Sequence, residues 1–107
     1  MADEIQTSHP TGRLDSGACA AFEVELIGYL NAGSQRLLID FSELDYISSA
    51  GLRVILMAAK RLKASGGSLA LCALNDTIGE VFEVSGFDRI LDIHPDAESA
   101  RARLAAS

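Results

Sequence analysis

Two adjacent hydroxyl side chains, Ser48 and Ser49, carry the strongest chemical signal in this sequence. They follow the apolar pair Tyr46-Ile47 and precede a segment with helical patterning. A serine at this position can cap the helix, because its oxygen accepts a hydrogen bond from a free backbone N–H. The position also suits an added phosphate, because the first-turn N–H groups and the helix dipole favour negative charge. The local sequence is therefore compatible with a structural cap or with a phosphorylation switch that changes the charge by about −1.5 to −2.

The remaining candidates for catalysis are few and lack catalytic spacing. His9 lies in a polar segment, and His94 precedes Pro95 at an expected helix start, so both favour surface or capping roles. The chain has no G-x-S-x-G nucleophile motif. Gly66-Gly67 lacks the lysine of a phosphate-binding loop and is typical of a helix stop. We expect no enzymatic activity and no catalytic residues.

Acidic and thiol side chains also give no convincing metal site. Asp40, Glu43 and Asp45 flank an expected strand end and turn, where solvated carboxylates are common. Cys19 and Cys72 lie in separate apolar segments, which favours buried free thiols over a disulfide or metal pair. We expect neither a metal ion nor a cofactor.

Length, composition and charge narrow the class of protein. The 107 residues suffice for one domain, and a hydrophobic content of 49% is too high for a disordered tail. The formal charge is 9 − 15 = −6 without a basic block, which argues against nucleic-acid binding. No apolar run approaches the roughly 20 residues that span a bilayer. Residues 1–15 lack the pattern of a signal peptide. We therefore expect a cytoplasmic protein without a membrane partner.

Helical periodicity predicts four helices. Asp15 or Ser16 is expected to cap a first helix that runs to about Asn31, and the second helix spans about 50–64. Asn75 is expected to cap a short third helix that Gly86 closes, and a last helix opens at Pro95 or Asp96. The apolar positions expected to face inward are Phe22, Leu26, Leu30, Leu52, Ile55, Leu56, Ala59, Leu62, Ile78, Val81, Phe82, Ala97, Ala100 and Leu104. The positions expected on the opposite side of the second helix are Arg53, Met57, Lys60 and Arg61.

Apolar runs between these helices predict strands. Residues 37–39 and 69–73 are continuous apolar runs, typical of strands covered on both faces, and 89–93 fits an edge strand. Residues 1–11 form a polar N-terminal segment in which Ile5 is the only aliphatic anchor for a possible edge strand. Strands that alternate with helices predict an α/β domain over residues 12–107, with a mixed, largely parallel β-sheet. The pattern leaves open whether helices cover one or both faces.

The stretch 38–52, Leu-Ile-Asp-Phe-Ser-Glu-Leu-Asp-Tyr-Ile-Ser-Ser-Ala-Gly-Leu, resembles the signature of STAS domains, and more narrowly of bacterial anti-sigma factor antagonists. The similarity extends upstream to Gly12-Arg13-Leu14-Asp15 and downstream through Gly66-Gly67, 69–72, 81–87 and Ile90, so it covers about residues 12–104. The resemblance implies a STAS-like fold and a binding protein rather than an enzyme.

In that family, the unphosphorylated antagonist captures an anti-sigma factor that is also its serine kinase, and phosphorylation breaks the complex. A serine phosphatase reverses the modification. The resemblance places the phosphorylation site on Ser49. Ser48 is a rival acceptor, because it stands where the family commonly has an aspartate. We expect Ser48, Ser49, Arg53 and Met57 to contact the partner, although Arg53 and Met57 also fit a solvated surface.

The N-terminal segment departs from the family pattern, and a second function also fits the sequence. Ser8-His9-Pro10-Thr11 occupies the place of the second of two N-terminal strands, which suggests a shortened sheet or an edge that pairs with another chain. The rival function is a STAS subunit of a lipid-transport or transporter-linked complex. The expected oligomeric state is a monomer or a weak dimer.

Overall fold

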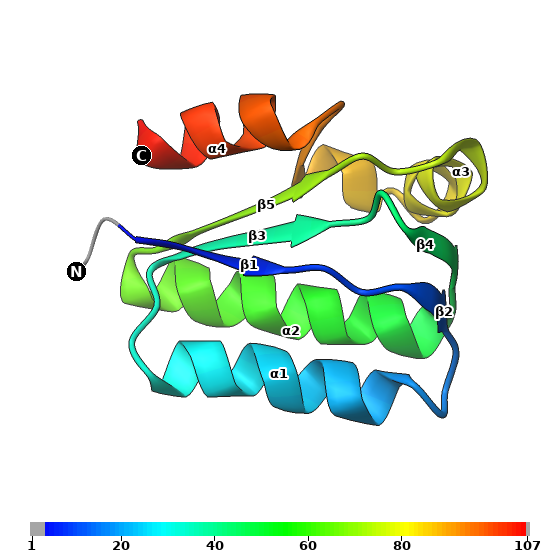
Figure 1. Cartoon of the computed structure of the whole chain (residues 1–107), viewed down its shortest axis with the longest axis horizontal. Coiled ribbons are helices and arrows are strands. Elements are labelled where there is room, and N and C mark those ends of the chain that lie inside the picture. Colours follow the sequence, from blue (N-terminus) through cyan, green and yellow to red (C-terminus); the bar gives the residue numbers. More distant parts are fainter. Residues whose placement is uncertain (1–3, 107) are drawn as a thin grey trace.

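The computed structural model describes residues 4–106 and has the expected α/β architecture, with a mostly parallel sheet and four helices (Figure 1). The elements in chain order are β1 (Ile5–Ser8), β2 (Gly12–Leu14), α1 (Cys19–Asn31), β3 (Arg36–Asp40), β4 (Leu44–Ile47), α2 (Ser49–Ser65), β5 (Ser68–Cys72), α3 (Asp76–Ser85), the 3₁₀ helix η1 (Phe87–Arg89), β6 (Asp92–His94) and α4 (Ala97–Ala105).

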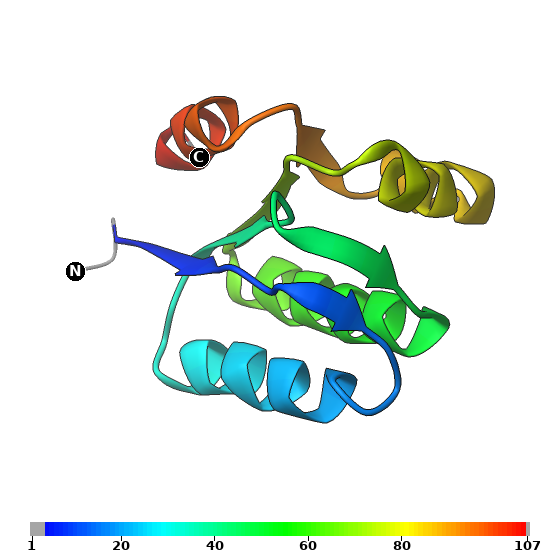
Figure 2. The ribbon, with the colours of Figure 1, turned by 45° about the vertical axis from the view of Figure 1, so that its right-hand side comes forward.

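The strands form two parallel groups. A four-stranded sheet has the order β1-β3-β5-β6, and β2 pairs with β4 in a separate two-stranded sheet. Helices α1 and α2 lie side by side on one face of the larger sheet, and α4 covers the other face (Figures 1 and 2). The structure therefore resolves the choice that the sequence pattern left open, because helices cover both faces.

Alternating side chains of the central strands build two cores. Leu37 and Ile39 of β3 point into the larger core beneath α1 and α2, whereas Leu38 joins Leu104 in the smaller core beneath α4. Successive side chains of a strand point to opposite faces, so a strand covered on both faces needs an uninterrupted apolar run. The apolar run at 37–39 has this structural cause.

Residues 5–8 form a strand at the edge of the larger sheet. β1 pairs with β3 in register from Ile5 with Arg36 to Ser8 with Ile39. Ser8 is fully buried, and its hydroxyl donates a hydrogen bond of 3.0 Å to the Glu25 carboxylate of α1. Pro10 falls between β1 and β2, where no strand hydrogen bond is needed.

Two expected boundaries were wrong. The first helix begins at Cys19, because the Asp15 carboxylate accepts hydrogen bonds from the backbone N–H of Gly17 and Ala18 in a preceding turn. The strand expected at 89–93 is shortened to Asp92–His94. Arg89 N–H donates to the Gly86 carbonyl, and Leu91 N–H donates to the Phe87 carbonyl, which coils the chain before the strand.

The buried face of α2 is also rotated from the expected one. Ile55 and Leu62 are buried as predicted, but Leu56 and Ala59 are only half-buried. Val54 and Ala58 are buried instead, and Met57, which was expected on the opposite side, is half-buried and packs against the larger core. The cause is the position of α1 beside α2, because side chains on the side of α2 that faces α1 become buried. No helix among residues 4–106 has the length and hydropathy needed to cross a membrane.

Candidate functional site

Ser48 caps the N-terminus of α2. Its side-chain oxygen accepts a hydrogen bond of 3.3 Å from Gly51 N–H, and its backbone is extended, with φ −89° and ψ 170°. Its own N–H donates to the Leu14 carbonyl at 2.9 Å, which ties the start of α2 to the end of β2. The Ser48 side chain is therefore half-buried and already used by the fold.

Ser49 is the first residue of α2 and is exposed. Within residues 4–106 its hydroxyl makes no hydrogen bond to another side chain or to the backbone. The two serines thus differ in chemistry, because the Ser48 oxygen serves the helix end while the Ser49 hydroxyl is available to a partner or an enzyme.

The first turn of α2 is electrostatically suited to an anion. It contains no acidic residue, so the positive end of the helix dipole is not compensated there. Arg53 is exposed and follows Ser49 by four residues, which places both on one side of the helix. A negative group on Ser49 would meet both the helix N-terminus and a guanidinium group.

A groove of about 420 Å³ runs between the N-terminal halves of α1 and α2. The residues that line it are Ser16, Cys19, Ala20, Glu23, Ala50, Arg53, Val54 and Met57. Met57 supplies apolar surface and Arg53 supplies charge, whereas Ser49 stands outside the groove on the same end of α2. The structure thus brings all four sequence-predicted residues to the N-terminal half of α2, where the half-buried Met57 both packs against the core and lines the groove.

Two residues that support this site were missed by the sequence analysis. Cys19 is buried at the base of the groove, and its Sγ lies 3.7 Å from the Ser48 Oγ. A Cβ added at Gly51 would come within 2.8 Å of the Ile47 Cγ1, so this glycine lets α2 begin close against β4. A glycine in the first turn of an otherwise strong helix was the available signal, because glycine weakens a helix unless close packing requires it.

Acidic residues at the end of β3 and in the turn after it contact neighbouring polar groups. Asp40 Oδ1 accepts a hydrogen bond of 2.9 Å from Ser42 N–H, and Glu43 lies 3.4 Å from His9 Nε2. Among residues 4–106, no three His, Cys, Asp or Glu side chains gather as metal ligands would.

Comparisons with known proteins identify the family of this chain. A family model for the STAS domain matches residues 2–100. BtrV of Bordetella bronchiseptica, which is named as an anti-sigma factor antagonist, is 45% identical over 95 residues, covering 89% of this chain and 79% of BtrV.

Solved structures extend the likeness to three dimensions. A Thermotoga maritima structure, also named as an anti-sigma factor antagonist, superposes with a TM-score of 0.90 at 25% identity, covering 97% of this chain and 89% of that one. SpoIIAA of Bacillus in its phosphorylated form superposes with a TM-score of 0.73 at 22% identity, covering 94% and 91%. The chain therefore belongs to the STAS domain family, within the group named for the anti-sigma factor antagonists.

Proposed function

We propose that this protein is an anti-sigma factor antagonist that captures an anti-sigma factor through the N-terminal end of α2 and releases it when Ser49 is phosphorylated. The single observation that carries the proposal is the free, exposed hydroxyl of Ser49 at a helix N-terminus, in a chain that is 45% identical to BtrV. SpoIIAA, whose fold this chain shares, exists in a phosphorylated and an unphosphorylated form.

The physical basis of the switch is a change of charge inside an interface. Neutral Ser49, together with Ser48, Arg53 and Met57, offers a mixed polar and apolar contact surface. A phosphate at Ser49 adds bulk and nearly two negative charges, which a partner must desolvate in order to bind. The same phosphate is stabilised in the free protein by the α2 dipole and by Arg53. Phosphorylation therefore lowers the free energy of the unbound state and raises that of the complex.

The chain performs no chemistry in this scheme. The anti-sigma factor acts as the serine kinase, and a serine phosphatase restores the hydroxyl. We expect the exchange to take place in the cytoplasm, and we expect the protein to act as a monomer or a weak dimer. The rival function, a STAS subunit of a lipid-transport or transporter-linked complex, requires no phosphorylation of Ser49.

The deciding experiment identifies the partner and the modified atom together. Proteins captured from the native cell extract are identified by mass spectrometry, and the captured kinase is purified and incubated with ATP and each of three chains. Wild type and Ser48→Ala should be phosphorylated, and Ser49→Ala should not. Phosphorylation at Ser48 alone, or capture of a permease without any kinase, contradicts the proposal and favours the rival function.

A further inference from the structure

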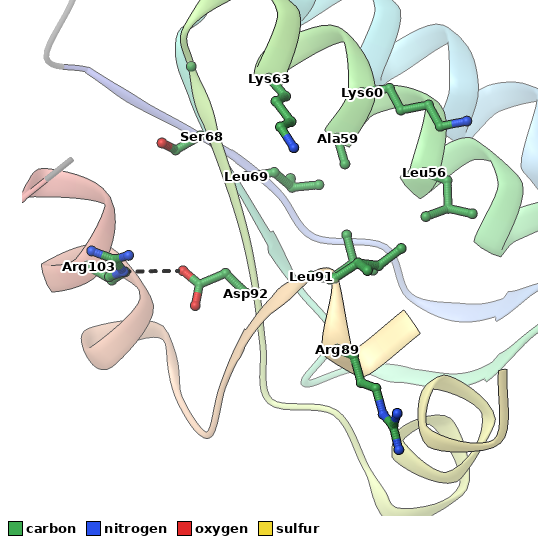
Figure 3. Close-up of a pocket in the computed structure, with 12 residues that line it drawn as sticks. Leu56, Ala59, Lys60, Lys63, Ser68, Leu69, Arg89, Leu91, Asp92 and Arg103 are labelled. Atoms are coloured by element: carbon green, nitrogen blue, oxygen red, sulfur yellow. Dashed lines mark ion pairs between the residues drawn. The ribbon is translucent and has the colours of Figure 1, made fainter. Parts of the chain in front are cut away.

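A second pocket lies at the opposite end of α2. It measures about 610 Å³ and is bounded by the C-terminal half of α2, the start of β5, the segment from Arg89 to Asp92, and α4 (Figure 3). An α-helix rises 1.5 Å per residue, so the α2 residues that line this pocket, from Leu56 to Lys63, lie roughly 10–20 Å along the helix axis from Ser49. The pocket therefore lies apart from the proposed switch.

The floor of this pocket is apolar. Leu56, Ala59, Leu69 and Leu91 point toward its centre from α2, β5 and the approach to β6 (Figure 3). All four are only half-buried, so the pocket leaves apolar surface in contact with water. Covering that surface with an apolar group would be favourable by about 25 cal/mol per Å².

The rim of the pocket is cationic. Lys60 and Lys63 come from α2, Arg89 from η1 and Arg103 from α4 (Figure 3). These are four of the nine lysine and arginine residues of a chain whose formal charge is −6. Positive charge that gathers from three elements around one pocket of an acidic protein favours an anionic ligand.

The acidic residue at this pocket is already engaged. Asp92 Oδ2 lies 3.9 Å from the Arg103 Nε, and Asp92 Oδ1 lies 3.0 Å from the His94 Nε2. Lys60, Lys63 and Arg89 form no ion pair within residues 4–106. Three cations thus remain for a ligand.

We propose that this pocket binds a small amphiphilic anion, a molecule with an apolar body and a carboxylate, phosphate or sulfonate group. The apolar body covers the leucines, and the anionic group pairs with Lys60, Lys63 or Arg89. The volume falls within the range of about 300–1,000 Å³ typical of small-molecule sites. The assignment does not rest on the proposed function, because it uses no residue of the Ser49 surface.

The test uses 8-anilinonaphthalene-1-sulfonate, which joins an aromatic body to a sulfonate and fluoresces when it leaves water. We expect saturable binding that octanoate displaces and that neither 1-octanol nor inorganic phosphate displaces at the same concentration. Binding should weaken when NaCl rises from about 0.05 to about 0.5 M, because salt screens the cations. Equal displacement by octanoate and 1-octanol would show an apolar site without charge selection and would overturn the proposal.

A matched pair of variants locates the charge. The double variant Lys60→Gln/Lys63→Gln should bind the probe about tenfold more weakly, because it removes two charge-assisted contacts. Arg61→Gln makes the same kind of change on the same helix, but Arg61 faces α1 and donates a hydrogen bond to the Asn31 side chain. This control should change the affinity by less than about twofold. Equal effects of the two changes, with both proteins folded by circular dichroism, would overturn the proposal.

Methyl NMR spectra locate the apolar body. Probe and octanoate should each shift the methyl signals of Leu56, Leu69 and Leu91. Val84, which is 82% exposed on α3, belongs to a separate apolar surface and serves as the internal reference. Shifts confined to Val84 and its neighbours would place the ligand on α3 and would contradict the assignment.

Discussion

The hydroxyl of Ser8 on β1 donates a hydrogen bond of 3.0 Å to the Glu25 carboxylate on α1, and Ser8 is the fully buried polar residue of the described chain. The other Glu25 oxygen accepts the Tyr29 hydroxyl at 2.7 Å. One carboxylate thus holds the edge strand against the helix layer, at the point where the sequence departs from an apolar strand.

Removal of this carboxylate should loosen the edge of the sheet. Glu25→Ala leaves the buried Ser8 hydroxyl without its acceptor, so we expect the free energy of unfolding to fall by about 1–3 kcal/mol. Glu23→Ala, on an exposed position of the same helix, should change it by less than about 0.5 kcal/mol. Urea denaturation of both variants checks this, and equal midpoints would contradict the role of Glu25.

The hydrogen bond from the Tyr29 hydroxyl to the Glu25 carboxylate raises the pKa of Tyr29 above its ordinary value, and burial makes a smaller contribution. A raised pKa means that the unfolded chain loses this proton first, so the stabilisation is complete below about pH 10 and is lost as pH rises through the folded-state pKa. Ultraviolet titration of Tyr46→Phe isolates Tyr29, because the chain has two tyrosines. Glu25→Gln in that background should lower the Tyr29 pKa, and an unchanged titration would assign the shift to another cause.

The packing of α2 predicts unequal costs for two adjacent truncations. Ile55 is fully buried, so Ile55→Ala should lower the free energy of unfolding by about 2–5 kcal/mol. Leu56→Ala removes a half-buried side chain at a pocket and should cost less than half as much. Arg53→Ala should stay within about 0.5 kcal/mol of wild type. A larger loss for Leu56→Ala than for Ile55→Ala would restore the face assignment made from the sequence.

Gly51 should resist substitution although it lies in a helix. A Cβ at this position would come within 2.8 Å of the Ile47 Cγ1, so Gly51→Ala should destabilise the domain by about 1–3 kcal/mol. Gly28 in α1 has open space around it, and Gly28→Ala should stabilise by about 0.5–1 kcal/mol. Thermal melts of the two variants should therefore shift in opposite directions, and shifts of the same sign would contradict the close approach.

The proposed switch predicts the binding behaviour of Ser49 variants. Ser49→Asp should weaken binding to the captured anti-sigma factor by at least about tenfold, because an unpaired charge in an interface costs several kcal/mol. Ser49→Ala should bind normally and keep the helix cap, since Ser48 supplies it. Ser34→Asp, in the loop after α1, adds the same charge away from the α2 N-terminus and should bind as wild type does. Isothermal titration decides, and equal affinities for Ser49→Asp and wild type would remove Ser49 from the interface.

The sequence alone determined the four helices and several of their caps, because these depend on residues close together in the chain. Asn75 and Asp96 cap α3 and α4 as predicted, accepting hydrogen bonds from the N–H of Ile78 and Ser99 three residues later. Gly66 ends α2 in the left-handed conformation, with φ 84°. The STAS signature likewise lies in one continuous stretch.

Only the tertiary structure decided which surfaces these elements share. The position of α1 beside α2 set the buried side of α2, which the apolar periodicity of α2 alone did not predict. Glu25 accepts a hydrogen bond from Ser8, which lies 17 residues away in the chain. Arg103 of α4 and Lys60 of α2 line the same pocket. Such contacts depend on how the helices dock on the sheet, so the spacing of residues within one helix or strand does not predict them.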